Sequence, residues 1–129
     1  MKTILLILTS IIFSTANLQA EPMRIMPLGD SITHGYPSGY RNYLWYQLED
    51  KEYNVDFVGS QNDGYLVTPP FDSNHEGYGG WKTYDIAEIV YGLLEDTPAD
   101  FILLHIGSND VSPTQGLDSS SVVGLEDIL

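Results

Sequence analysis

The sequence predicts an α/β fold with a parallel sheet, because three short apolar runs alternate with helical patterns along the chain. Residues 24–28, 55–59 and 101–106 are rich in aliphatic side chains, and each run ends at small or polar residues, which is typical of buried strands. The chain has 129 residues and shows no internal repeat, so the sequence favours one small domain.

Helices are expected between and after these strands, where apolar side chains recur every three to four residues. The expected helices span residues 40–51, 83–94 and 119–129. Ser38 or Gly39 is expected to cap the first helix and Thr83 the second. Residues 61–80 show no helical period and contain two adjacent prolines, so they predict a long loop of the kind that usually carries function.

The first twenty residues read as a signal peptide. Lys2 gives a positive start, residues 4–13 are mostly apolar, and residues 16–20 offer small side chains for cleavage after Ala20. This pattern predicts a secreted or periplasmic protein whose mature chain is residues 21–129. The chain has no cysteine, so disulfides cannot stabilise it.

The chain is strongly acidic, with a formal net charge of −13. A field of this sign repels nucleic acid and anionic lipid headgroups. We therefore expect no nucleic-acid partner and no stable membrane insertion, while the oligomeric state is left open.

Ser31 follows the first expected strand directly, within Gly29-Asp30-Ser31. In open α/β sheets ligands bind outside the carboxyl ends of the strands, so a serine there is well placed as a nucleophile. The alternative is that Asp30 or Ser31 merely caps the next helix, as such residues often do. The motif alone leaves both readings open.

Two further segments extend the pattern. A glycine-dense loop that ends at Gly80 precedes the second helix, and Gly107-Ser108-Asn109-Asp110 follows the last strand. In order and spacing these blocks resemble those of the SGNH, or GDSL, hydrolases. That family's fourth block, Asp-x-x-His near the C-terminus, has no counterpart after Asn109, because all three histidines precede residue 110.

The resemblance implies a flavodoxin-like three-layer α/β/α sandwich that is incomplete at the C-terminus, with residues 21–129 forming the N-terminal part of an esterase domain. It implies that Ser31 is the nucleophile. The backbone N–H groups of Ser31 and Gly80 and the side-chain amide of Asn109 would form the oxyanion hole, with Gly79 as the second choice for the glycine. No cofactor and no metal are implied.

Longer segments are similar to the SGNH carbohydrate esterases that remove acetyl groups from xylan. The similar segments are residues 24–33, 39–41, 44–45, 55–61 and 75–77, with Gly80-Trp81. The implied activity is deacetylation of a carbohydrate, so the expected partner is a small-molecule or polysaccharide ester. The alternatives are a lysophospholipase or thioesterase of the lipolytic GDSL type, and an inactive truncated fragment.

The remaining titratable residues near the blocks have expected roles. His34 is expected at the rim of the site and is a weak candidate for the missing base. His75 is expected to line the acyl or sugar pocket, and His105 to be a hydrogen-bonded core histidine. Asp30 and Asp110 are expected to hold their loops through backbone hydrogen bonds.

Overall fold

Strand β1 (Met23–Gly29) is the centre of the sheet. In the computed structural model, which describes residues 20–112 and 116–117, β1 pairs in parallel with β2 (Val55–Phe57), β3 (Glu76–Gly77) and β4 (Phe101–His105). β2 pairs with the start of β1 and β3 with its end, while β4 runs along the residues from Ile25 onward. The predicted parallel α/β fold is confirmed.

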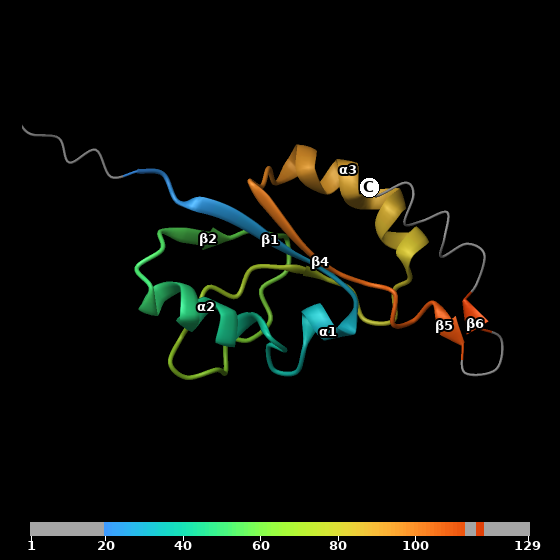
Figure 1. The fold of residues 1–129 in the computed structure, drawn as a ribbon, viewed down its shortest axis with the longest axis horizontal. Coiled ribbons are helices and arrows are strands. Elements are labelled where there is room, and N and C mark those ends of the chain that lie inside the picture. The colour runs from blue at the N-terminus through green and yellow to red at the C-terminus, as the bar shows by residue number, and fades with distance from the viewer. Residues whose placement is uncertain (1–19, 113–115, 118–129) are drawn as a thin grey trace, which may run out of the picture.

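The described helices lie on both sides of this sheet (Figure 1). They are α1 (Ser31–His34), α2 (Arg41–Asp50) and α3 (Thr83–Asp96). α3 buries its apolar face against β1, where Ile86 and Val90 pack with Met26 and Leu28. On the other face, Trp45 of α2 meets Phe57 edge to face with ring centroids 5.2 Å apart. The three-layer arrangement is thus built from two separate apolar contacts.

Both expected cap assignments are wrong. α2 begins after Tyr40, which makes no side-chain capping bond, while the Ser38 hydroxyl donates to Asn42 Oδ1 at 2.9 Å. α3 begins after Lys82, whose backbone N–H donates to Asp85 Oδ2 at 2.8 Å. The buried side chain of Thr83 bonds to a distant residue instead. Both hydroxyls that the sequence suggests as caps thus bond to other side chains, Ser38 to one in the first turn of α2 and Thr83 to one in the loop after β4.

β3 corrects the expectation of a structureless loop over residues 61–80. This two-residue strand pairs Glu76 with Leu28 and Gly77 with Gly29, and a bridge joins Gln61 to His75. A strand of this length is too short to produce a recognisable sequence pattern. β3 occupies the same edge of β1 as β2, further along, and so brings the glycine-dense loop to the carboxyl end of the sheet.

The remaining elements lie near the C-terminus. Strands β5 (Val111–Ser112) and β6 (Gly116–Leu117) form an antiparallel pair that the sequence did not predict. The predicted signal peptide, Ala20 excepted, and the predicted helix over residues 119–129 lie outside the described residues. Within the described part, no helix is long and apolar enough to cross a membrane.

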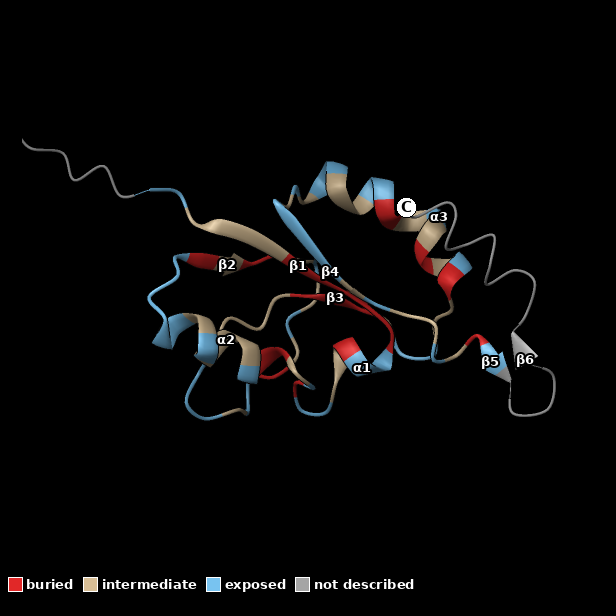
Figure 2. Ribbon diagram, viewed as in Figure 1, coloured by how far each residue is buried: buried red, intermediate tan, exposed pale blue. Residues whose placement is uncertain are grey.

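β4 is covered on one side only. Leu104 packs towards α3, whereas Phe101, Leu103 and His105, which alternate with it along the strand, are exposed (Figure 2). The expectation that His105 is a core histidine is therefore wrong, because α2 covers β2 and not this face of β4. Among the described residues β4 pairs only with β1, so its second edge is also open.

His75 lies just before β3 and is fully buried. Its Nδ1 accepts a hydrogen bond from Gly77 N at 2.9 Å, and its Nε2 accepts one from Asp63 N at 3.4 Å. Asp63 Oδ2 also lies 3.6 Å from Nε2. Burial, with smaller contributions from Arg41 and His34, lowers the pKa of His75 from 6.5 to about 4. The expectation that His75 lines a pocket is therefore wrong, since its ring is part of the interior.

We expect residues 21–129 to self-associate, because an apolar strand with an open edge and an uncovered face is a template for pairing. Phe101, which is 59% exposed, is the most exposed apolar side chain on this strand. Phe101→Lys should raise the monomer fraction in sedimentation velocity, since a charge on an edge strand opposes pairing. Tyr91→Lys on α3 is the control, and a monomeric parent chain with a sharp cooperative melt would contradict the expectation.

We expect His75 to make folding stability depend on pH. The unfolded chain binds its proton below pH 6.5, but the folded chain binds it only below about 4, so the free energy of unfolding falls as pH falls through this window. Many carboxylates titrate nearby, so the informative quantity is the difference between the parent and His75→Gln in urea denaturation at pH 7 and 5. His105→Gln is the exposed control. Equal pH dependence of parent and His75→Gln would contradict the expectation.

Candidate active site

Ser31 is the first residue of α1 and stands at the carboxyl end of β1. Asp30 is the cap of this helix, because its Oδ1 accepts from Ile32 N at 2.9 Å. Ser31 itself is exposed, and among the described residues neither its hydroxyl nor its backbone N–H donates a hydrogen bond. Asp30 therefore caps the helix, and the hydroxyl and N–H of Ser31 remain available within the described structure.

Gly80 lies three residues after β3, at the same end of the sheet. Its φ of +82° falls in the left-handed region that favours glycine, and no atom lies within 4 Å of the position that a Cβ would take. Its backbone N–H has no acceptor in the part of the chain that the structure describes. Gly79 is equally open but has no such φ, so the backbone geometry distinguishes Gly80 from the second choice.

Asn109 follows β4, and one N–H of its side-chain amide holds the side chain in place. Its Nδ2 donates to the backbone oxygen of Trp81 at 2.8 Å, beside Gly80, which leaves the second amide N–H to donate elsewhere. Trp81 in turn stacks on Tyr78, with ring centroids 4.1 Å apart, and Tyr78 N donates to Gly29 O at 2.8 Å. The loops after β1, β3 and β4 are therefore joined through a short series of contacts.

Two buried carboxylates complete these connections, as the sequence predicted. Asp30 Oδ2 accepts from the hydroxyl of Ser108 in the loop after β4. Asp110 Oδ1 accepts from the hydroxyl of Thr83 at 2.9 Å and from its backbone N–H at 3.1 Å, which ties the same loop to the start of α3. Residues next to Ser31, Gly80 and Asn109 are thus hydrogen-bonded to one another, so all three lie at the carboxyl end of the sheet.

The spacing Asp-x-x-His occurs once in the chain, at Asp72 and His75, a match that the sequence reasoning passed over. Asp72 accepts from the backbone N–H groups of Phe57 and Asn74, at 2.8 and 3.2 Å. His75 is buried with both ring nitrogens facing Gly77 and Asp63. Neither side chain is free to act on Ser31, so this pair supports the loop after β2.

His34 is partly exposed at the C-terminal end of α1, as expected of a residue at the rim. Its Nε2 lies 3.6 Å from Asp63 Oδ2. No hydrogen bond joins its ring to Ser31 among the described residues. In those residues there is also no cluster of three or more His, Asp or Glu side chains that could hold a metal ion.

Two buried charged residues were missed by sequence reasoning, although both lie in segments that carry the family resemblance. Glu76 accepts from Ser60 N and from the hydroxyl of Tyr78, each at 2.5 Å, and burial together with this contact raises the pKa of Tyr78 to about 12. Arg41 is fully buried, and its guanidinium donates only to backbone oxygens. A charged residue inside a matched segment was the signal that could have identified them.

Comparison with known proteins finds several similar esterases. No protein-family model matches the chain. A multidomain esterase of Ruminococcus flavefaciens is 41% identical over 117 residues, which cover 72% of this chain and 15% of that protein. A family 3 carbohydrate esterase of Clostridium thermocellum superposes with a TM-score of 0.71 at 33% identity, over 84% of this chain and 55% of the other.

A solved SGNH-hydrolase family esterase superposes with a TM-score of 0.61 at 20% identity, over 85% of this chain and 52% of the other, which supports the fold alone. The chain thus spans about half the length of the solved esterases and 15% of the curated relative. The resemblance expected from the sequence is confirmed: over the residues that the structure describes, the chain has the SGNH hydrolase fold and is similar to the family 3 carbohydrate esterases.

Proposed function

We propose that this chain carries the nucleophile and the oxyanion hole of a serine esterase. The observation that carries the proposal is the position of three residues at the carboxyl end of the sheet. Ser31 is exposed, Gly80 has free space beside it, and Asn109 uses only one of its amide N–H groups among the residues that the structure describes. Hydrogen bonds between neighbouring residues join the loops that carry them. Each contributes what acyl transfer needs, namely a hydroxyl that can attack and neutral donors fixed before the reaction begins.

In the proposed reaction, Ser31 Oγ forms a bond to the ester carbonyl carbon while its proton passes to a base. The carbonyl oxygen becomes the oxyanion and accepts from Ser31 N, Gly80 N and Asn109 Nδ2. The alcohol oxygen then leaves with a proton from the same base, giving an acyl-Ser31, and water releases the acid by the same two steps. No group is oxidised or reduced in these steps.

The base is proposed to come from outside the described residues, as the family resemblance implies. Among residues 20–112, His75 is buried and His105 is on the exposed face of β4, opposite Gly29 in the register. His34 is the only described histidine near Ser31 along the chain, and Asp63 beside it could orient the ring. It is therefore the second candidate.

We propose an acetylated carbohydrate as the substrate, on the similarity to carbohydrate esterases. The lipolytic alternative needs an apolar groove that reaches Ser31. The large apolar groove, of about 440 Å³, lies between α2 and the starts of β1 and β4, lined by Met23, Ile25 and Phe101 among others. Along β4 the lining reaches only Leu103, which lies opposite Pro27 of β1, and Ser31 is not among the lining residues. This groove therefore does not supply the acyl site that the lipolytic alternative needs.

We expect residues 21–129 alone to hydrolyse 4-nitrophenyl acetate only at the residual level that an oxyanion hole supplies, about 10³–10⁴-fold over water. If the gene encodes further sequence downstream, the chain extended by it should be faster by orders of magnitude, and Ser31→Ala should abolish that gain. In the extended chain Asn109→Ala should lower kcat by about 10²–10³-fold. Asn62→Ala, at an exposed asparagine, is the matched control.

Two results would contradict this proposal. Activity of the extended chain that survives Ser31→Ala would remove Ser31 as the nucleophile. Strong Ser31-dependent turnover by residues 21–129 would place the base within them, and loss of that turnover in His34→Ala would then assign it to His34. An extended chain without activity would favour the non-enzymatic alternative.

A further inference from the structure

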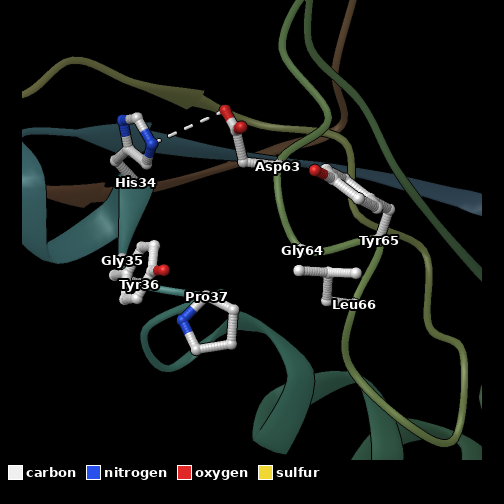
Figure 3. A pocket seen from close by; sticks show the side chains of 8 residues that line it. All are labelled: His34, Gly35, Tyr36, Pro37, Asp63, Gly64, Tyr65 and Leu66. Atoms are coloured by element: carbon white, nitrogen blue, oxygen red, sulfur yellow. Dashed lines mark ion pairs between the residues drawn. The ribbon is translucent and has the colours of Figure 1, made fainter.

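A separate pocket of about 170 Å³ opens beside α1. One wall is formed by residues 34–37, which end α1 and lead into the next loop, and the other by residues 63–66 of the loop after β2. Figure 3 shows the two walls facing each other across the hollow. The volume is below the roughly 300–1,000 Å³ of pockets for drug-sized ligands, so it suits a single small ring.

Arg41 fixes the distance between the two walls. Its Nη2 donates to His34 O and to Asp63 O, each at 2.8 Å, so one nitrogen bonds to both walls. Its Nε donates to Thr33 O at 2.8 Å and its Nη1 to Ser73 O at 2.6 Å. Burial lowers the pKa of Arg41 to about 10, which still leaves the guanidinium charged at neutral pH. The pocket is therefore formed before any ligand arrives.

The lining combines two polar side chains with exposed apolar rings. Asp63 Oδ2 lies 3.6 Å from His34 Nε2, and both side chains are about half-exposed, so their polar atoms remain accessible to a ligand. At the mouth, Tyr36 is fully exposed and Tyr65 is 83% exposed, and Pro37 and Leu66 lie next to them. Within the described residues neither tyrosine ring has a partner, so both offer flat apolar surface to a ligand.

A pyranose ring matches this lining. It presents C–H groups on its faces, which pack against aromatic rings and proline, and hydroxyls at its edge, which bond to carboxylate and imidazole. The net charge of −13 and the carboxylate of Asp63 disfavour an anionic ligand. A fatty acyl chain would displace water from the half-exposed side chains of Asp63 and His34 without offering either a hydrogen bond, which costs free energy.

Ser31 does not line the pocket but lies one helical turn before His34, the first residue that does. α1 has four residues, so Ser31 and His34 stand three positions apart and lie on the same helix face. We propose that the pocket between residues 34–37 and 63–66 binds one sugar ring of a neutral oligosaccharide. Binding there is independent of catalysis, while the assignment of this ring as the neighbour of the esterified sugar rests on the proposed function.

The test is isothermal titration of unacetylated xylotetraose and cellotetraose into the parent chain, Ser31→Ala, Tyr65→Ala and Asp63→Asn. We expect the parent and Ser31→Ala to bind at least one of these sugars equally. Tyr65→Ala should weaken binding about tenfold, which corresponds to about 1.4 kcal/mol. Asp63→Asn keeps the backbone oxygen that Arg41 bonds, so it tests the carboxylate without removing that contact. Tyr91→Ala, an exposed tyrosine on α3, is the matched control.

The outcomes separate this inference from the proposed function. Absence of binding by either sugar at millimolar concentration, or equal binding by the parent, Tyr65→Ala and Asp63→Asn, overturns it even if the extended chain hydrolyses acetyl esters. Binding that Tyr65→Ala and Asp63→Asn weaken supports it even if no turnover is found. If Tyr65→Ala does not fold, Asp63→Asn and sugar-induced amide shifts of Gly64 and His34 in NMR spectra give the same decision.

Discussion

The structure depends on two buried carboxylates that tie the loops at the carboxyl end of the sheet to one another. Asp30 caps α1 and accepts from Ser108, and Asp110 accepts twice from Thr83 at the start of α3. Both aspartates are almost wholly buried, so losing a donor would leave a desolvated carboxylate, which costs far more than an exposed contact gains. Because Asp30 makes these bonds, Ser31 is not needed to cap α1 or to hold the loops.

The elements with strong periodicity were predictable from the sequence. β1 and β2 are apolar because their inward side chains are covered, and α3 has an apolar face because it rests on β1. β4 has the same apolar pattern although most of its side chains are exposed within the described part of the chain. The position of Ser31 at a strand end was predictable because polar residues that follow a buried strand lie at its end. The choice of Asn109 came instead from the resemblance to the SGNH hydrolases. The motif and the fold therefore both put these residues at the carboxyl end of the sheet.

Other features were not predictable because distant residues decide them. β3 exists only because its two residues lie opposite the end of β1. Thr83 does not cap α3 because its hydroxyl bonds to Asp110 instead. Arg41 looks like an ordinary helix residue, yet its four carbonyl partners make it the support of the pocket beside α1. His105 was misjudged because alternation gives the face of a strand and not what covers that face.

We propose that Ser31 N, Gly80 N and Asn109 Nδ2 converge on one oxyanion. Acetate titrated into isotope-labelled protein tests this directly, because a bound carboxylate oxygen shifts the NMR signals of every amide that donates to it. The account predicts that these three signals move together with one dissociation constant, and that Asn109→Ala weakens the shifts at Ser31 and Gly80. Shifts confined to one of the three, or unchanged in Asn109→Ala, would contradict it.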